Sequence, residues 1–142
     1  MIYTNLTKKA LSLCFEAHKN QLDKSGMPYV FHPFHLAEQM ETVETVVVAL
    51  LHDIVEDTDY TIDDLKNMGF PNTVTDAIAL MTHDAATEYM DYVARIKTNP
   101  IAKVVKLADL RHNSDLSRLN VVTSEALRRR EKYLEALEIL EG

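Results

Sequence analysis

Residues 46–58, VVVALLHDIVEDT, carry the strongest pattern in the chain. Six apolar residues lead directly into His52-Asp53, and Glu56 and Asp57 follow within one helical turn. On a helix that turns about 100° per residue, these four polar side chains fall within an arc of about 140°, and the apolar residues lie behind them. We therefore expect one central helix with a wide apolar back and a narrow face of one imidazole and three carboxylates.

No lysine or arginine lies between Lys24 and Lys66 to neutralise these carboxylates. Crowded acids beside an imidazole repel one another unless a cation lies among them, so the stretch favours a site for a hard metal ion. The alternative is an acidic helix end with a surface histidine. The helix dipole disfavours acids at a C-terminal end, which counts against that alternative.

Length and composition limit the classes of protein that fit. The chain has 142 residues, of which 46% are hydrophobic, and we expect residues 1–142 to form a single domain with one core. The formal net charge of −7 argues against a nucleic-acid partner, because such proteins need a basic surface. The longest apolar run is too short to span a membrane. The single cysteine and the lack of a signal-peptide pattern predict a cytoplasmic protein.

Three glycines and four prolines leave few breaks, and the periodic segments between them predict helices. We expect helices at about 4–20, 33–40, 42 or 45 to 58, 61–69, 73–82, 87–99, 100–113 and 123–140. In the last of these we expect the leucines to face the core, namely Leu127, Leu134, Leu137 and Leu140. No segment makes a convincing strand, so the predicted fold is all-α, a compact single-domain helical bundle.

Two features lie outside the central stretch. Pro33 fits the first position of the second helix, which would place His32 just before it in an extended conformation, well mounted to bind a ligand. Asp109 lies in the otherwise apolar segment KLADL, one turn before Asn113. A buried aspartate is costly unless it is paired or metal-bound, and a salt bridge to Lys106 or Arg111 explains it as well as a metal does.

These motifs, in this order, resemble the HD-domain metal-dependent phosphohydrolases. The segments AHKNQLDKSGMPYVFHP (17–33), ALLHDIVEDT (49–58) and VVKLADLRHN (104–113) are similar to the alarmone hydrolase domain of RelA/SpoT-type proteins and its small single-domain relatives. The resemblance covers about residues 10–120 and implies an HD-type fold. The implied reaction is removal of the 3′-pyrophosphate from ppGpp or pppGpp, with a small nucleotide as the substrate.

The resemblance also implies roles for individual residues. One divalent metal ion, usually manganese, would be held by His32, His52, Asp53 and Asp109. Two imidazoles and two carboxylates are compatible with iron or zinc as well. Glu56 and Asp57 would be the catalytic pair, one acting on water and the other on the leaving oxygen. The positions near the substrate would be Lys24, Ser25 and Asn113.

The chain departs from the family pattern in places that concern the nucleoside. Asp23 stands where the family usually has an arginine that packs on the guanine base, and Leu110-Arg111 follows Asp109 in place of the commoner order Arg-Leu. Ser114-Asp115-Leu116 replaces a run that ends in a hydroxyl residue. Two alternatives therefore stay open. One is an HD phosphohydrolase of another nucleotide or phosphorylated metabolite, and the other is a helical module that binds a nucleotide without turnover. The sequence pattern does not indicate which oligomeric state the protein adopts.

The remaining histidines receive structural interpretations. His18 lies one turn before Gln21, and we expect it to support the site or to pack rather than to bind metal. His112 is expected to pack or to line the pocket. His83-Asp84 repeats the dipeptide, but no acid pair follows it, so we expect a surface loop unrelated to the site.

Overall fold

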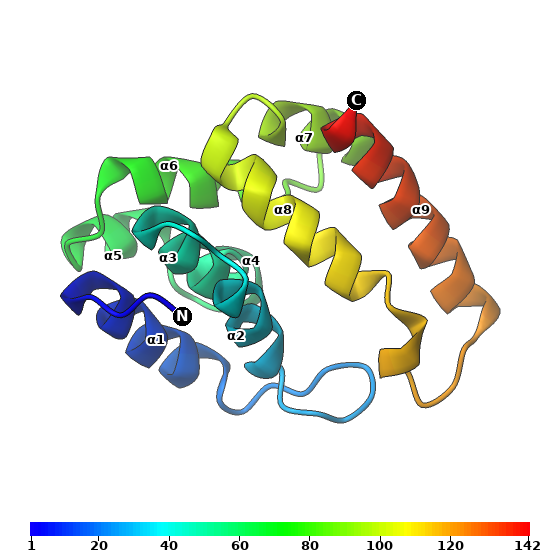
Figure 1. Ribbon diagram of the computed structural model, residues 1–142, viewed down its shortest axis with the longest axis horizontal. Helices are drawn as coiled ribbons and strands as arrows, with labels where there is room; N and C mark the ends of the chain where they lie inside the picture. Colours follow the sequence, from blue (N-terminus) through cyan, green and yellow to red (C-terminus); the bar gives the residue numbers. More distant parts are fainter.

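The computed structural model describes residues 1–142 and is all-α, as predicted (Figure 1). An isolated bridge between Leu22 and Pro28 is the one β-type pairing. The elements are α1 (Asn5–His18), α2 (Phe31–Glu38), α3 (Val43–Leu51), α4 (Ile54–Asp57), α5 (Ile62–Asn67), α6 (Asn72–Met81), α7 (Tyr89–Ile96), α8 (Pro100–Asn113), the 3-10 helix η1 (Leu116–Arg118) and α9 (Ser124–Glu141).

Helix α3 is the centre of the fold. It packs against α1, α2, α6 and α8, and Val46–Leu51 are at most 1% exposed. A helix that is apolar all round is buried all round, so the expected division into an apolar back and a polar face is wrong here. The helix ends at Leu51, and Glu56 and Asp57 belong to the separate short helix α4. His52 Nδ1 bonds the carbonyl of Ala49, which supplies a partner to a helix-end carbonyl at this break.

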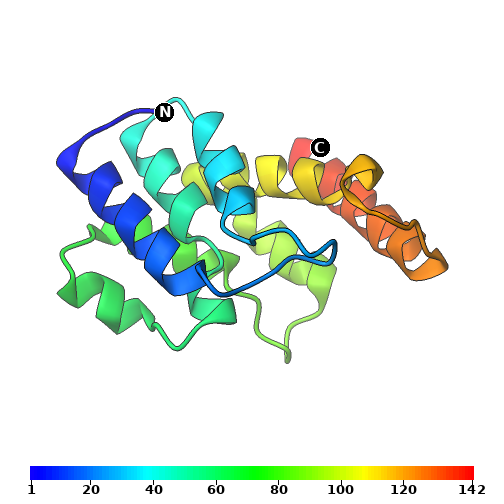
Figure 2. The ribbon, with the colours of Figure 1, turned by 90° about the horizontal axis from the view of Figure 1, so that it is seen from below.

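Helices α1 and α2 frame one side of α3, as Figures 1 and 2 show. A capping box between Thr4 and Thr7 starts α1, whose core side carries Ala10 and Cys14. Helix α2 starts at Phe31, so His32 is helical and the expected extended conformation is wrong. Pro33 is the third helical residue, where a missing N–H costs no intrahelical bond.

The two longest helices of the C-terminal half, α8 and α9, pack along each other (Figure 1). The inward face of α9 consists of Ala126, Ala136 and Leu140, so small side chains fill much of its contact with the core. Leu127 and Leu134 are 46% and 38% exposed, and the prediction that they face the core is wrong. Helix α9 is rotated from the expected orientation, and part of its basic face is turned toward the pocket described below.

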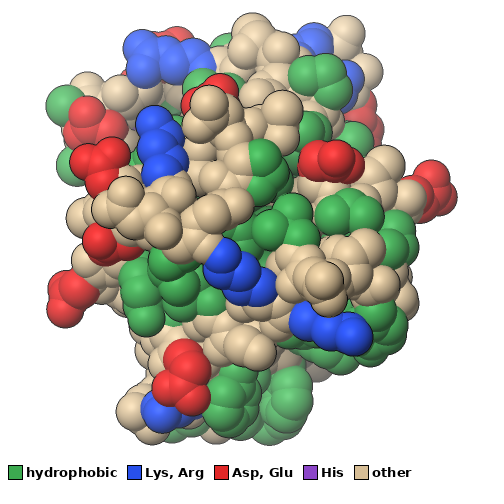
Figure 3. Space-filling view, turned by 90° about the vertical axis from the view of Figure 1, so that its left-hand side faces the viewer, with side chains coloured by type: hydrophobic (Ala, Val, Ile, Leu, Met, Phe, Trp, Pro, Cys, Tyr) green, Lys and Arg blue, Asp and Glu red, His purple; other side chains and the backbone are tan.

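The buried hydrophobic side chains form one core cluster that runs through α1, α2, α3, α6 and α8. Acidic and basic side chains are interspersed with hydrophobic ones on the face seen in Figure 3. No helix combines the length and the apolar character that crossing a bilayer requires.

Candidate active site and metal centre

A pocket of about 770 Å³ brings together residues that are far apart in the sequence. Its walls come from the loop after α1, from α2, α4 and α8, from the loop before α7, and from η1 and α9. This volume falls within the range of pockets that enclose small molecules. All the residues that the resemblance singled out lie in or directly beside it.

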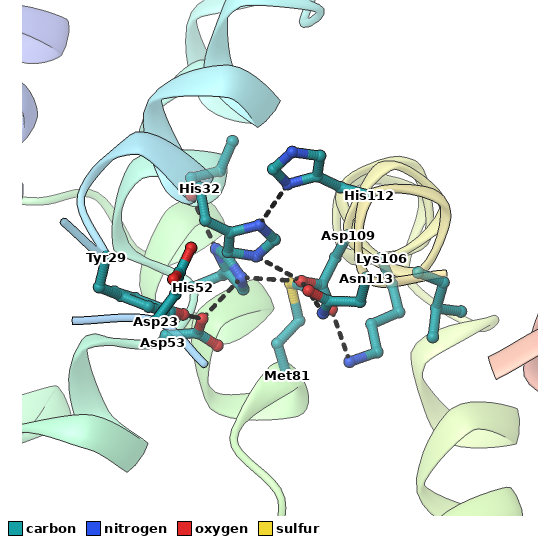
Figure 4. A network of polar contacts seen from close by, with 12 residues as sticks. Asp23, Tyr29, His32, His52, Asp53, Met81, Lys106, Asp109, His112 and Asn113 are labelled. Atoms are coloured by element: carbon teal, nitrogen blue, oxygen red, sulfur yellow. Dashed lines mark hydrogen bonds and ion pairs between the residues drawn. The ribbon is translucent and has the colours of Figure 1, made fainter. Parts of the chain in front are cut away.

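Three candidate ligands converge at the floor of the pocket (Figure 4). His32 from α2, His52 at the end of α3 and Asp109 from α8 offer ligand atoms that all lie within 4.8 Å of one another. Asp109 Oδ1 is 2.8 Å from His32 Nε2 and 3.3 Å from His52 Nε2. All three side chains are buried. Residues 32, 52 and 109 therefore form a compact cluster that joins three helices.

The contacts of the two ring nitrogens of His52 suit this cluster to a cation. His52 Nδ1 lies 2.7 Å from the carbonyl oxygen of Ala49, so Nδ1 carries the proton and donates it. The other ring nitrogen, Nε2, is buried and has no hydrogen-bond partner. It faces carboxylate oxygens of Asp109 and Asp53, the latter at 3.1 Å. A divalent metal placed between these groups would bind the imidazole nitrogen and balance the buried carboxylates, so the cluster fits a cation.

Asp53 lies at the edge of the cluster. Its carboxylate receives a hydrogen bond from the Tyr29 hydroxyl and is outside the compact group of three. Burial raises the pKa of Asp53 well above its usual value, and the negative charges of Asp109 and Asp57 add to the effect. A nearby metal ion would favour the ionised carboxylate, so Asp53 also fits a cation site.

The partners of Asp109 are divided between its two carboxylate oxygens. Lys106 donates to Oδ2 at 3.0 Å, while Oδ1 faces the two histidines. Burial alone would raise the pKa of Asp109, but the charge of Lys106 and the hydrogen bond with His32 outweigh it and hold the pKa well below the usual value. Of the two salt bridges expected from the sequence, the one to Lys106 exists, while Arg111 pairs with Glu141. The Lys106 bridge occupies Oδ2, so Oδ1, on which both histidines converge and to which Asn113 donates, is the oxygen that could face a metal.

His112 has a more specific place than the sequence indicated. Its Nδ1 lies 2.7 Å from His32 Nδ1, and the two rings stack with centroids 5.0 Å apart. Burial and the charge of Arg118 lower the pKa of His112 to about 4. His112 is thus neutral near pH 7 and fixes the ring of a candidate ligand from behind. Its spacing of three residues from Asp109 places both on one side of α8.

Glu56 and Asp57 lie on α4 at the pocket wall, and both are exposed. The backbone N–H of His83 donates to Glu56 Oε1, so the loop before α7 contacts the expected catalytic pair. The prediction that His83 is unrelated to the site is therefore wrong, because the loop returns to α4 only in the folded chain. On the other side, Gln21 donates to the carbonyl of Asp57, and His18 Nδ1 lies 2.7 Å from Gln21 Oε1.

The expected substrate residues line the pocket, but two of them have protein partners. Ser25 Oγ donates to the carbonyl of Arg118, and Asn113 donates to Asp109 Oδ1. Lys24 lies near Arg129 and Lys132. Burial and the charges of these two residues lower the pKa of Lys24. Arg129 and Lys132 also line the pocket. These two residues come from the last helix, for which the expectation from the sequence concerned only the leucines.

Comparisons with known proteins identify relatives of this chain. No family model matches it. The chain is 32% identical over 153 aligned positions to guanosine-3′,5′-bis(diphosphate) 3′-pyrophosphohydrolase MESH1 of Danio rerio, an alignment that covers 98% of this chain and 84% of the relative. It is 30% identical over 139 positions to a probable GTP pyrophosphokinase of Mycobacterium leprae. That match covers 89% of this chain and 18% of the relative, so the chain spans less than a fifth of that protein.

A solved structure shares the fold. It is the metazoan ortholog of SpoT described as hydrolysing ppGpp, which matches with a TM-score of 0.79 and 24% identity. The match covers 100% of this chain and 89% of that one. Every helix of the present structure therefore belongs to a known all-α architecture.

Proposed function

The chain belongs to the family of guanosine-3′,5′-bis(diphosphate) 3′-pyrophosphohydrolases that includes MESH1 of Danio rerio, and we propose on this premise that it hydrolyses ppGpp. In this reaction water adds to the phosphorus attached to the 3′ oxygen, and the bond between that oxygen and phosphorus breaks. The products are GDP and pyrophosphate. The observation that carries the proposal is the buried cluster of His32, His52 and Asp109, which can hold a cation and lies at the floor of a nucleotide-sized pocket.

The proposed metal ion is Mn²⁺, held by His32, His52, Asp53 and Asp109. When bound, such an ion neutralises phosphate charge and lowers the pKa of a water molecule. His112 keeps His32 in place through its ring nitrogen, and Lys106 balances the charge of Asp109. These contacts orient the proposed ligands before any substrate arrives.

Glu56 and Asp57 are proposed to move the protons. The N–H of His83 fixes the orientation of the Glu56 carboxylate, which suits Glu56 to accept a proton from the attacking water. Partial desolvation at the pocket wall raises the pKa of Asp57, and we propose that Asp57 delivers a proton to the leaving 3′ oxygen. His18 and Gln21 support this residue from behind, through the carbonyl of Asp57.

The cations around Lys24 are proposed to attract the phosphates of the nucleotide. The formal net charge of −7 repels polyanions at long range, so local cations are needed. Lys24, Arg129 and Lys132 provide them on one wall. Ser25 and Asn113 are proposed to lie beside the substrate while they also hold neighbouring residues. We further propose that the protein acts in the cytoplasm.

The test is a chromatographic assay of purified protein with Mn²⁺ and ppGpp. The expected result is equal production of GDP and pyrophosphate. The Glu56→Gln variant is the matched control, and it should bind the metal and form little product. Parallel reactions with GTP, ATP and adenosine 3′-diphosphate test the alternative of a different phosphorylated substrate. That alternative stays open because Asp23 replaces the family's usual base-packing arginine. Turnover of one of these and none of ppGpp would contradict the proposal.

A further inference from the structure

Two segments far apart in the sequence close one end of the pocket together. The loop at residues 21–30 reaches across to the η1 segment beyond α8 (Figure 1). Ser25 Oγ donates to the carbonyl of Arg118 at 2.8 Å, and Asn120 Nδ2 donates to the carbonyl of Ser25 at 3.2 Å. Gly26, with a φ of +80°, permits the tight turn that brings this loop back to Pro28. The end of the pocket away from the floor is thus a fixed two-part wall.

Arg118 is held in this wall by its edges. Its Nη1 donates to the carbonyl of His112 at 3.0 Å, and its Nη2 lies 3.9 Å from Asp23 Oδ2. The side chain is 27% exposed and lines the pocket. Asp23 also stabilises the loop, because its Oδ1 accepts hydrogen bonds from the backbone N–H groups of Ser25 and Met27. Asp23 therefore turns the loop and steadies Arg118 at the same time.

The occupied edges decide what this guanidinium can bind. An arginine that grips phosphate uses its N–H edges, and here part of that edge is directed at His112 and Asp23. The flat faces of a guanidinium carry no hydrogen bonds and stack well on aromatic rings. Apolar side chains line the same end of the pocket, namely Leu22, Leu116 and Leu119. A planar nucleobase fits this combination better than a phosphate does.

We propose that Arg118 recognises the nucleobase of the substrate by stacking, and that Asp23 is the positioning residue that holds Arg118 in place. The inference deepens the function proposed above and rests on it for the identity of the nucleotide. The inference also gives Asp23 a different role from the one its sequence position suggested. That residue is a poor surface for a base, but its carboxylate steadies the arginine that offers one. An Asp23→Arg substitution would remove the acceptor of two loop N–H groups, so it does not test base recognition cleanly.

The experiment compares Arg118→Ala and Arg118→Lys with the unmodified protein, with ppGpp as the substrate. Loss of a stack over a base raises KM about 2- to 30-fold, the equivalent of roughly 0.5–2 kcal/mol. The turnover number should stay within about two-fold, because contacts remote from the reacting bond act equally on ground and transition states. Arg118→Lys should not restore KM, since an ammonium has no flat face. Asp23→Asn keeps the loop acceptor and removes the charge, so it should raise KM less than Arg118→Ala.

Arg111→Ala is the matched control, because Arg111 is exposed and pairs with Glu141 outside the pocket. Calorimetric titration with GDP and with inorganic pyrophosphate separates this inference from the proposed function. Arg118→Ala should weaken GDP binding by the same factor as KM and leave pyrophosphate binding unchanged, whether or not ppGpp is hydrolysed. Unchanged GDP affinity, no GDP binding by the unmodified protein, or full recovery by Arg118→Lys would each overturn the role of Arg118. Failure to hydrolyse ppGpp would overturn only the proposed function.

Discussion

His52 is the residue at which the fold and the site meet. One ring nitrogen bonds the last turn of α3, and the other faces the carboxylates without a hydrogen bond. The backbone contact fixes which nitrogen is available, so the folded chain prepares a metal ligand with no further adjustment. Asp109 completes the arrangement, since both histidines share its Oδ1.

The first prediction concerns Asp109. Asp109→Ala removes the oxygen that the two histidines share and leaves Lys106 buried without its partner. Breaking a buried ion pair on one side costs about 3–5 kcal/mol, so we expect a lower urea midpoint together with loss of bound metal. Elemental analysis and urea unfolding measure the two effects. Asp63→Ala, at an exposed position of α5, should change neither. Full metal content in Asp109→Ala would remove Asp109 from the ligand set.

The second prediction separates chemistry from metal binding. Glu56→Ala and Asp57→Ala should each keep the metal and lower the turnover number about 10²-fold or more, because each removes a proton-transfer group. Steady-state kinetics and metal analysis on the same preparations decide this. Loss of metal would make these residues ligands. Near-normal rates would mean that α4 is only an acidic helix end.

At the scale of elements, the loop between α6 and α7 acts on the site through its backbone. The backbone N–H of His83 donates to Glu56. The centroid of the His83 ring lies 4.6 Å from that of Tyr92, and His83 Nε2 lies 2.8 Å from the carbonyl oxygen of Thr87. Our third prediction is that His83→Ala loosens this loop and lowers the turnover number less than Glu56→Ala does, with unchanged metal content. A turnover number equal to that of the unmodified protein would show that the loop does not position Glu56.

The elements also show what sequence patterns can and cannot predict. Periodicity and the sparse glycines and prolines located the helices, and Thr4, Thr42 and Thr61, at which three of the expected helices start, are N-caps in the structure. The end of α3 at Leu51 was not predicted. His52 Nδ1 contacts the carbonyl of Ala49 at this break, and helical periodicity carries no information about such a contact. Leu127 and Leu134 were expected inside, but the rotation of α9 depends on how closely Ala126 and Ala136 approach the core.

At the scale of the whole molecule, the cluster ties together α2, α3 and α8, and a bound metal would cross-link them. Our fourth prediction is that chelation lowers the melting temperature. A ligand present at 100 times its Kd stabilises the folded state by about 2.7 kcal/mol, which corresponds to roughly 5–10 °C for a chain of this size. Differential scanning calorimetry with and without a chelator measures the shift, and Mn²⁺ should restore it. An unchanged melting temperature would contradict a metal at this junction.

The same scale explains which parts of the site were predictable. Residues 32, 52, 53, 56, 57 and 109 stand in three short motifs, and the acids of the central motif lack nearby cations, so the sequence marks them, although their proposed roles await the tests above. The contributions of His83, Arg118 and Arg129 depend on distant segments meeting at one pocket. No local sequence pattern predicts these tertiary contacts, because each segment by itself is an ordinary polar loop or helix face.

The central claim is that this pocket hydrolyses ppGpp with one divalent metal ion. The most direct measurement is the rate of pyrophosphate release from ppGpp as Mn²⁺ is added stepwise to the metal-free protein. The rate should rise from near zero and reach its plateau at one equivalent per chain, and Asp109→Ala should stay inactive throughout. A full rate without metal, or no pyrophosphate at saturating Mn²⁺, would contradict the claim.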